Sequence, residues 1–456
     1  MAPGEGRAAG ARLEWAVDLR WGVDVPSWAE QAIFWHVYPL GFLGAERAAV
    51  PEVTHRLRGL VPWLDHAVAL GADALQLGPV FAAETHGYDT LDHFRIDPRL
   101  GDDGDFDALV SAAHERGLRV LLDGVFNHVG QGFPRFQQAL REGPGSAAAR
   151  WFRLRWPADG GPPAHDDFEG HQSLVALDHA EPAVAEHVAA VMAHWLDRGA
   201  DGWRLDAAYA VPPRFWARVL PRVRGGRPGT YVVGEVIHGD YAAFVAETGV
   251  DAVTQYELWK AIWSSLNDRN AFELAWALKR HTAFAESFVP MTFVGNHDVT
   301  RIASRLTDVR HLPHALAVLM TVAGTPSLYA GDEYAMRGVK EEREGGDDAV
   351  RPAFPASPAG LPPDGLPVLE LHRRLIALRR RHPWLSRAHT TDLTLSNQLY
   401  AYESRSGEHA LAVALSTGDE PSQVTLPFSG RLGAGDGDLD GTLLTLPPHG
   451  WAVVEH

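Results

Sequence analysis

The chain of 456 residues contains no cysteine. Disulfide bonds, thiolate metal sites and a cysteine nucleophile are therefore excluded. It also lacks a run of about eighteen apolar residues, the length that a membrane-spanning helix needs. The N-terminus is rich in Ala and Gly, and no apolar segment of signal-peptide length follows it. Together these absences predict a protein without a membrane anchor that works in the cytoplasm.

Positive charge is scarce. There are 41 Lys and Arg residues against 58 Asp and Glu residues, which gives a formal net charge of -17. A surface of this sign repels phosphate backbones and anionic membranes, so we expect neither nucleic-acid nor membrane partners. A neutral small molecule such as a sugar is not affected. The 15 Trp residues allow two interpretations, because Trp side chains fill protein cores and also stack on sugar rings.

From residue 31 onward, short apolar or β-branched runs alternate with longer segments of helical periodicity. This alternation predicts βα units, a parallel sheet and an α/β fold. Eight strands are expected, which is the number that closes a (β/α)8 TIM barrel. They are Ile33–Tyr38, Ala74–Leu77, Arg119–Leu122, Gly202–Leu205, Tyr231–Val233, Ala252–Gln255, Met291–Val294 and Ser327–Tyr329.

Helix signals lie between these strands. Asp105 is expected to cap a helix over Phe106–Arg116, and Pro182 to open a helix that Gly199 ends. The apolar spacing in Leu366–Arg381 predicts the last long helix.

Composition divides the chain into four parts. Residues 1–30 are an N-terminal extension, and 31–387 form the barrel. About 80 residues separate the third and fourth strands, so 129–178 are expected to form a short inserted domain at the barrel rim. Residues 388–456 contain short strands without helices between them, which predicts an antiparallel β-sandwich. Within it, 430–441 alternates Gly and Asp and is expected to be an exposed loop.

Three carboxylates follow three of the predicted strands: Asp206, Glu235 and Asp298. Cleaving a glycosidic bond needs two carboxyl groups with opposed protonation states, and a parallel barrel brings strand ends to one rim. Arg204 lies on the same side of its strand as Asp206 and favours the charged form of a nucleophile. Glu235 should be less stabilised as an anion and so act as the acid.

Asp298 follows Asn296-His297 and is placed to hold sugar hydroxyls and favour a positively charged transition state. Each motif alone also has a simpler interpretation. Arg204 and Asp206 could be a structural pair, Glu235 a solvated rim carboxylate, and Asp298 a metal ligand or a helix cap.

Two more loops carry candidate substrate-binding residues. The segment Asp123–His128 follows the third strand, where His128 can donate to a sugar hydroxyl and Phe126 lies beside it. His86-Gly87-Tyr88-Asp89 follows the second strand, and Tyr88 offers a flat face for a sugar ring. The simpler alternatives are a core histidine and a turn with an exposed aromatic residue.

In this combination and order the motifs resemble the α-amylase family of glycoside hydrolases, family 13. The resemblance covers about residues 31–456. The matching regions are Asp123–His128, Gly202–Asp206, Gly234–Glu235 and Asn296–Asp298, together with Gly87–Asp97 and Gly324–Glu333.

The resemblance implies specific roles. Asp206 would be the nucleophile, Glu235 the acid/base and Asp298 the transition-state stabiliser. Tyr88, His128, Arg204 and His297 would surround the sugar at the cleavage point, with His86, Asp89 and Phe126 in the same loops. Asp347 and Arg351 look like the family's acidic–Arg pair after the eighth strand, with Asp348 as an alternative to Asp347.

Two departures from the family pattern stand out. Tyr209 and Ala210 occupy positions where calcium-dependent relatives have Lys and His. Although Asn127 could still ligate calcium, we expect no metal or cofactor to be required. Val236-Ile237-His238 follows the acid where relatives place an aromatic residue nearer to it, so the +1 subsite should be built differently.

The inserted segment from Phe168 to Asp178 resembles the neopullulanase and cyclomaltodextrinase branch, but the N-terminal β-domain usual there is missing. We therefore expect small oligosaccharide substrates. The leading hypothesis is a retaining α-glycoside hydrolase acting on malto-oligosaccharides by double displacement. A transglycosylase, isomerase or sucrose-acting enzyme of the family is the alternative. A non-catalytic sugar-binding barrel is more remote, because such relatives typically lose one of the three carboxylates.

Overall fold

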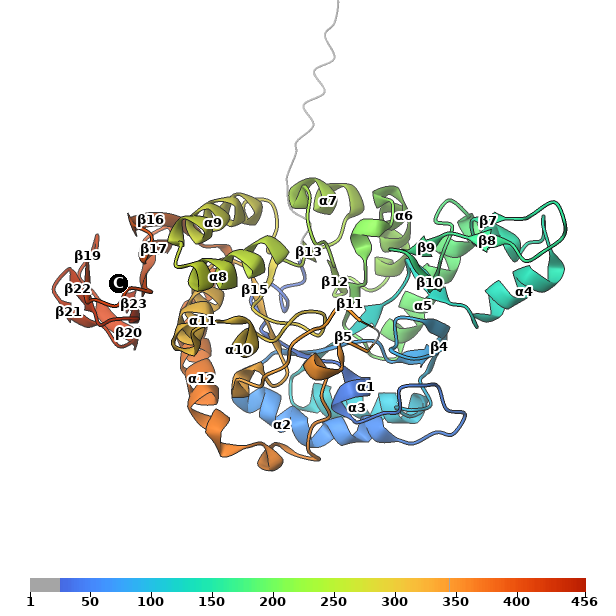
Figure 1. Cartoon of the computed structure of the whole chain (residues 1–456), viewed down its shortest axis with the longest axis horizontal. Coiled ribbons are helices and arrows are strands. Elements are labelled where there is room, and N and C mark those ends of the chain that lie inside the picture. The colour runs from blue at the N-terminus through green and yellow to red at the C-terminus, as the bar shows by residue number, and fades with distance from the viewer. Residues whose placement is uncertain (1–24, 344) are drawn as a thin grey trace, which may run out of the picture.

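The computed structural model describes residues 25–343 and 345–456. Most of the predicted N-terminal extension, 1–24, lies outside the described residues. Figure 1 shows a central barrel with a β-domain at one end and a small insertion at the other. No helix in the described part of the chain has both the length and the apolar character needed to cross a bilayer.

Eight parallel strands form the central sheet in the order β13-β12-β11-β5-β2-β1-β15-β14. A parallel bridge between Thr254 and Met291 joins its two edges, so the sheet closes into a barrel. The prediction of eight strands is confirmed, with ends that differ by at most two residues. The strands are β1 (Phe34–Val37), β2 (Ala74–Leu77), β5 (Arg119–Gly124), β11 (Gly202–Leu205), β12 (Tyr231–Gly234), β13 (Ala252–Val253), β14 (Met291–Phe293) and β15 (Thr325–Tyr329).

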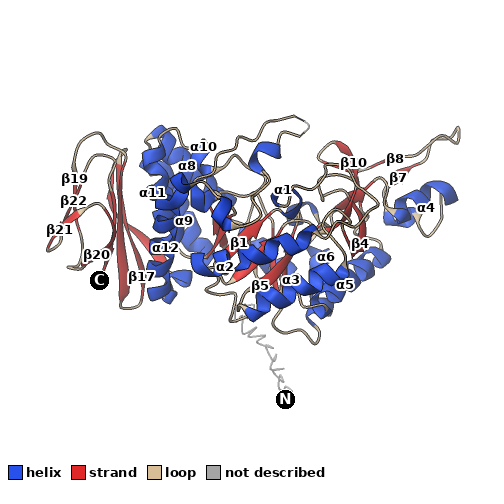
Figure 2. Ribbon diagram, turned by 90° about the horizontal axis from the view of Figure 1, so that it is seen from below, coloured by secondary structure: helices blue, strands red, loops and turns tan. Residues whose placement is uncertain are grey.

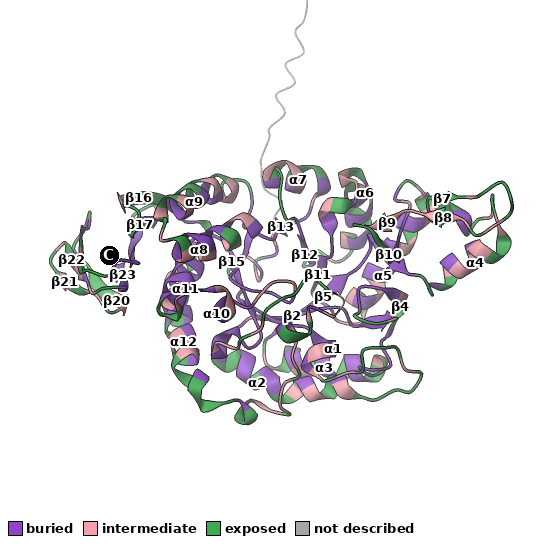
Figure 3. Ribbon diagram, viewed as in Figure 1, coloured by how far each residue is buried: buried purple, intermediate pink, exposed green. Residues whose placement is uncertain are grey.

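Helices surround the barrel, and the strands are buried between them (Figure 2, Figure 3). The strands read as continuous apolar runs because both faces of a barrel sheet are covered. Trp35, Trp63, Trp195, Trp203 and Trp216 are fully buried, so these five belong to the core. The helices are α1 (Pro39–Phe42), α2 (Val61–Leu70), α3 (Asp103–Glu115), α5 (Pro182–Asp197), α6 (Pro213–Arg224), α7 (Tyr241–Thr248), α8 (Tyr256–Asp268), α9 (Ala271–Ala285), α10 (Ile302–Arg305), α11 (Leu312–Thr321) and α12 (Leu366–Arg381).

The predicted starts of α5 and α12 are confirmed, but the predicted cap of α3 is wrong. Asp102, not Asp105, is the N-cap of α3. Its side chain accepts from the Asp105 amide, and the Asp105 side chain accepts from the Asp102 amide. Both residues are therefore part of one capping box, in which the acidic residue three positions on resembles a cap in the sequence.

The insertion lies between β5 and β11. Its main sheet is antiparallel, with the strand order β6-β10-β9. The strand β10 leads back towards the barrel, so the hairpin of β9 and β10 stands beside the carboxyl ends of the strands. The elements are β6 (His128–Gly130), α4 (Pro134–Glu142), β7 (Leu154–Arg155), β8 (Ala164–His165), β9 (Asp167–Phe168) and β10 (His171–Ala176). A separate hairpin, β3 (Phe81–Ala83) and β4 (Thr90–Ile96), follows β2.

The C-terminal part consists of two antiparallel sheets. Residues 430–441, expected to be a loop, instead contain β20 and β21, so that prediction is wrong. β20 pairs with β23 across a bulge, and the pairing with an apolar neighbour outweighs the weak propensity of its Gly residues. The strands are β16 (His389–Leu395), β17 (Leu399–Ser406), β18 (His409–Ser416), β19 (Ser422–Thr425), β20 (Arg431–Gly435), β21 (Asp438–Asp440), β22 (Leu443–Leu446) and β23 (Trp451–Glu455).

Candidate active site

A buried arginine lies at the centre of the carboxylates at the barrel rim. Arg204 Nη1 donates to both oxygens of Asp123 at 2.8 Å and to Asp206 Oδ1 at 2.9 Å. Its Nη2 lies 2.8 Å from Glu235 Oε1 and 4.0 Å from Asp298 Oδ2. The structure therefore brings the three predicted carboxylates together, and the predicted contact between Arg204 and Asp206 is confirmed.

Arg204 favours the charged form of Asp206, as predicted, but burial acts against it. Burial raises the pKa of Asp206 well above its ordinary value, and the neighbouring Glu235 and Asp123 raise it further. Arg204 opposes this rise but does not outweigh it. Burial likewise raises the pKa of Asp123 to about 6, against the lowering effect of Arg204. Arg204 is shared among several carboxylates, so it does not hold Asp206 ionised by itself.

Glu235 is contacted at both of its carboxylate oxygens. Besides Arg204, the Tyr256 hydroxyl donates to Oε1 at 3.1 Å and the Ala207 amide donates to Oε2 at 2.9 Å. That Glu235 acts as the acid stays a prediction. β11 pairs with β12 so that Leu205 lies opposite Gly234. This register puts Glu235 beside the arginine of the neighbouring strand, which spacing within one strand does not reveal.

Asp298 is held from the opposite side. Arg351 Nη2 donates to Asp298 Oδ1 at 2.8 Å, and Arg351 Nε donates to the carbonyl oxygen of His297 at 2.9 Å. Asp347 Oδ2 lies 3.0 Å from Arg351 Nη2, whereas Asp348 pairs with Arg47. Of the two alternatives for the acidic partner of Arg351, the structure therefore has Asp347.

Aromatic rings line the floor of the site. His297 stacks between Tyr88 and Tyr38, with ring centroids 5.5 and 5.7 Å apart and planes within 7°. The Tyr88 hydroxyl contacts His297 Nε2 and donates to Asp123 Oδ2 at 3.0 Å. The Arg351 guanidinium lies 4.6 Å from the centre of the Tyr38 ring. Tyr88 is thus fixed on three sides and presents a preset surface.

Sequence reasoning missed three residues of this site: His36, Tyr38 and Tyr256. His36 packs on His297 with ring centroids 4.9 Å apart, and the Tyr256 hydroxyl accepts from Asn296 at 2.9 Å. A signal was available, because His36 and Tyr38 are polar residues two apart at the end of the first strand and point to one side. Tyr256 follows the end of the sixth strand in the same way.

His128 is buried and stacks on Phe168 of the insertion, with ring centroids 4.7 Å apart. Its Nδ1 is 3.1 Å from Asn127 Nδ2, while Nε2 has no hydrogen-bond partner among the described residues. A buried polar atom without a partner is costly, and a ligand hydroxyl would satisfy it. His128 is therefore available for the predicted sugar contact.

The other predicted residues of these loops have different surroundings in the structure. Phe126 is fully buried and packs against His93, Trp203 and Trp216, so its assignment to substrate binding is wrong and it belongs to the core. It alternates with its polar neighbours and so faces away from the rim. Both carboxylate oxygens of Asp89 accept from Thr85. His86 lies exposed at the rim.

The tip of the β9–β10 hairpin reaches the barrel. The Tyr209 hydroxyl donates to Glu169 Oε1 at 2.7 Å, and Tyr209 lies near His238 with ring centroids 6.3 Å apart. Glu169 has a φ of 53°, a left-handed conformation typical of a tight turn. Tyr209, which departs from the family pattern, therefore links the insertion to the loop that follows β11.

Among the described residues, no group of three His, Asp or Glu side chains gathers around Asn127. In the whole described part of the chain, only two groups of three or more His, Asp and Glu side chains lie close enough together for a cation. Neither group includes a neighbour of Asn127. The Asn127 amide nitrogen contacts His128, and Ala210 supplies no side-chain ligand. That activity needs no calcium stays a prediction.

Comparison with known proteins identifies relatives. The family model described as alpha amylase, catalytic domain, matches residues 36–355. A cyclomaltodextrinase from Geobacillus thermopakistaniensis is 28% identical over 94% of this chain and 77% of its own length. An intracellular maltogenic amylase from Bacillus subtilis is 28% identical over 69% of this chain and 57% of its own.

Among solved structures, the cyclic α-maltosyl-(1→6)-maltose hydrolase from Arthrobacter globiformis, in complex with that sugar, superposes with a TM-score of 0.81. It is 28% identical to this chain, and the match covers 95% of this chain and 100% of the other.

Proposed function

The chain belongs to the α-amylase family of glycoside hydrolases, and from this premise we propose that it cleaves α-glucosidic bonds of small malto-oligosaccharides with retention of configuration. The observation that supports this most strongly is the convergence of Asp206, Glu235 and Asp298 around Arg204. The Tyr88 ring beside them offers a stacking surface for the sugar.

In the proposed reaction, Asp206 attacks the anomeric carbon while Glu235 protonates the leaving oxygen. Water then releases the sugar, with Glu235 as the base. Asp298 and Arg351 are adjacent, so Asp298 is held in place to accept sugar hydroxyls. His128 Nε2, unpaired among the described residues, takes another hydroxyl.

This reaction needs the acid proton on Glu235. Burial raises the pKa values of Asp206 and Asp123, whereas Glu235 accepts hydrogen bonds from Tyr256 and Ala207 and pairs with Arg204. We infer that an entering glucosyl unit separates Glu235 from Arg204 and so leaves it able to take the proton. Arg204 then pairs more fully with Asp206, which favours its ionised form.

Short or cyclic substrates are supported by the insertion. Its Phe168 stacks on His128 and its Glu169 contacts Tyr209, so the hairpin tip narrows the rim at the candidate site. The aligned relatives include a cyclomaltodextrinase and a hydrolase of a cyclic tetrasaccharide. We propose cyclic and linear malto-oligosaccharides as the substrate class.

The test is a product profile on maltotriose, a cyclodextrin, panose, sucrose and trehalose. Release of glucose or maltose from the α-glucans, with the new reducing end initially in the α-configuration, supports the proposal. Transfer products in place of hydrolysis would identify the transglycosylase alternative. Asp206→Asn should lose more than about 10³-fold in kcat, and full activity in that folded variant would refute the role of Asp206.

We also propose a cytoplasmic location and no nucleic-acid or membrane partner. The name of the intracellular maltogenic amylase from Bacillus subtilis and the net charge of -17 support this. Fractionation of cells that express the natural gene, with antibody detection, tests the location.

A further inference from the structure

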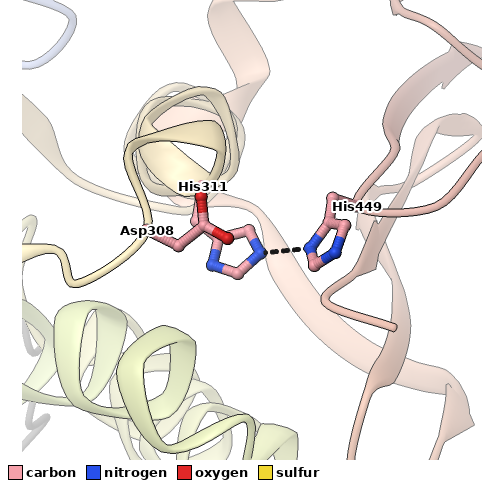
Figure 4. Close-up of side chains that lie close together, drawn as sticks. All are labelled: Asp308, His311 and His449. Atoms are coloured by element: carbon pink, nitrogen blue, oxygen red, sulfur yellow. Dashed lines mark hydrogen bonds between the residues drawn. The ribbon is translucent and has the colours of Figure 1, made fainter. Parts of the chain in front are cut away.

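Two histidines and an aspartate converge where the barrel meets the C-terminal sheets (Figure 4). Asp308 and His311 lie at the start of α11, and His449 lies in the loop between β22 and β23. One potential ligand atom from each lies within 4.8 Å of the other two. Both histidines are buried, and Asp308 is partly buried. The cluster therefore joins two parts of the chain that are separated by more than a hundred residues.

The two ring nitrogens of His449 face different neighbours. His449 Nε2 lies 2.8 Å from Asp419 Oδ1. An ionised carboxylate only accepts, so Nε2 carries the hydrogen and Nδ1 keeps a lone pair. That lone pair faces His311 Nε2 at 2.9 Å. A carboxylate behind a histidine that orients its free nitrogen is the usual outer arrangement of a metal ligand.

We propose that Asp308, His311 and His449 bind one divalent transition-metal ion, with zinc as the best match. Two imidazoles and one carboxylate suit zinc, which completes its tetrahedron with water, whereas calcium prefers six to eight oxygen ligands. Ligand atoms about 2.0–2.2 Å from zinc lie roughly 3–3.5 Å from one another. The ligand atoms lie within 4.8 Å of one another, so binding would draw them closer and would loosen part of the pairing between Arg310 and Asp308.

The surrounding charges are compatible with a cation. Arg310 donates to both oxygens of Asp308 from its backbone amide, Nε and Nη2 at 2.6–3.1 Å, and Arg269 pairs with Asp419 at 2.9 Å. Each carboxylate has two oxygens with several lone pairs, so it can serve an arginine and the ion or histidine together. The charges of the two aspartates and the two arginines cancel. The lone pairs of the two histidines are then the groups that bind the ion.

The ion would fasten the C-terminal domain to the barrel. The same seam is crossed by the hydrogen bond from His314 Nε2 to the Ser416 carbonyl, at 2.9 Å. An ion bound by both His311 and His449 would add a further link across this seam to the polar contacts already present. Its effect should therefore appear in stability, whether or not the proposed hydrolase activity is correct.

The test uses the full chain, stripped of metal by a chelator and dialysed. Titration with zinc should give one tight site per chain by calorimetry, and zinc should raise the thermal midpoint by a few degrees. Cobalt bound in place of zinc should give the intense visible bands of a four-coordinate site. Calcium should not bind tightly and should not raise the thermal midpoint.

The variants His311→Ala and His449→Ala should lose the tight site, the cobalt bands and the zinc-dependent rise in midpoint. His389→Ala, which removes an exposed histidine of the same domain, is the matched control and should keep all three. If His449→Ala does not fold, Asp308→Asn provides the milder test of the bands. The proposal is overturned if the wild-type chain takes up no zinc, or if the site persists in both histidine variants. In that case the contact between His311 and His449 is an ordinary hydrogen bond.

Discussion

Arg204 has a different task from the one that its place beside Asp206 indicates. One guanidinium bridges Asp123, Asp206 and Glu235 at 2.8–2.9 Å, with side chains almost wholly removed from water. Several carboxylates crowded into such a space repel one another, and the shared cation is what allows them to coexist. The fork of Arg matters here, because it serves several acceptors at fixed angles.

Arg204→Lys should therefore be far from conservative. A lysine keeps the charge but cannot bridge the three carboxylates, so kcat/KM should fall about 10²–10³-fold. Steady-state kinetics on a cyclodextrin measure the loss, and circular dichroism checks the fold. Arg218→Lys, on α6 away from the carboxylates, is the control and should stay near the wild-type value. Wild-type kinetics in a folded Arg204→Lys variant would contradict the central role of Arg204.

Tyr256→Phe tests the second donor to Glu235. The hydroxyl of Tyr256 donates to Glu235 and accepts from Asn296, so its removal takes a hydrogen bond from the anionic form of the carboxylate. That form is then less favoured, and the alkaline limb of the pH–rate profile should move to higher pH, with a roughly tenfold change in kcat.

The control for this variant is Tyr402→Phe. It removes another buried hydroxyl, bonded to Thr321 at 2.7 Å in the C-terminal part of the chain. It should lower stability by about 1 kcal/mol without moving the pH profile. An unchanged profile in Tyr256→Phe would mean that this hydroxyl does not act on Glu235.

At the residue scale, the sequence predicts which carboxylates meet but not which charges they carry. Asp206, Glu235 and Asp298 are recognisable because each ends a strand of a parallel barrel. Their protonation depends on burial and on neighbours from other segments, such as Arg204, Tyr256 and Ala207 around Glu235. The prediction that Phe126 binds substrate is wrong for a related reason, because only the structure shows that it packs against Trp203 and Trp216.

At the scale of elements, the β9–β10 hairpin is the feature most specific to this chain. Its tip touches the loop after β11 through Glu169 and Tyr209. The two residues come from segments 40 positions apart, and no local pattern in either segment predicts the contact. The hairpin therefore joins the walls of the substrate site.

Tyr209→Phe should weaken the contact between the hairpin and the loop after β11. The hydrogen bond to Glu169 is partly exposed, so its loss should cost about 1 kcal/mol and raise KM for cyclic substrates roughly fivefold, with kcat little changed. Initial rates on a cyclodextrin measure this effect. Glu169→Gln keeps an acceptor for the hydroxyl and should lie near wild type. A fall in kcat with unchanged KM would show that Tyr209 serves the chemical step instead.

Strands and helices follow from the sequence wherever burial is uniform. The strands of the barrel are buried on both faces and read as apolar runs, so all eight are recognisable. β20 and β21 are edge elements rich in Gly and Asp, and they exist because β23 and β22 pair with them. Such pairing is a tertiary effect that propensity does not contain.

At the scale of the whole molecule, buried histidines should make the protein sensitive to acid. Among the described residues, burial lowers the pKa of seven histidines to about 3 or 4, whereas three aspartates are raised to about 6 and Asp206 is raised as well. Each histidine binds its proton more readily in the unfolded chain, so its contribution to stability is complete above pH 6.5 and is lost towards pH 4.

The aspartates act in the opposite sense, since their contribution is complete below about pH 3.8 and is lost as the pH rises through 6. Because the histidines are more numerous, the free energy of unfolding should fall between pH 7 and pH 5, by up to about 1.4 kcal/mol per pH unit for each net proton, and the urea midpoint should fall with it. Equilibrium unfolding followed by tryptophan fluorescence measures this. A midpoint that rises on acidification would show that the aspartates dominate.

Removal of calcium should leave activity unchanged. No group of three His, Asp or Glu side chains gathers around Asn127 in the described part of the chain, and Ala210 supplies no side-chain ligand. The assay should use EGTA, which prefers calcium, at a temperature well below the thermal midpoint, so that a zinc-dependent change in stability does not interfere. A large loss in EGTA that calcium restores would refute the expectation.

The closure of the barrel also determines when the first strand can pair during synthesis of the chain. β1 pairs with β15, so Phe34 needs Ser327 as a neighbour, about 290 residues later in the chain. A ribosome that adds 5–20 residues per second needs about 15 to 60 s to cover that distance. Until then the first strand has an unpaired edge, which is exposed to wrong partners. The nascent chain must therefore be protected for most of its synthesis, and an N-terminal half expressed alone should aggregate.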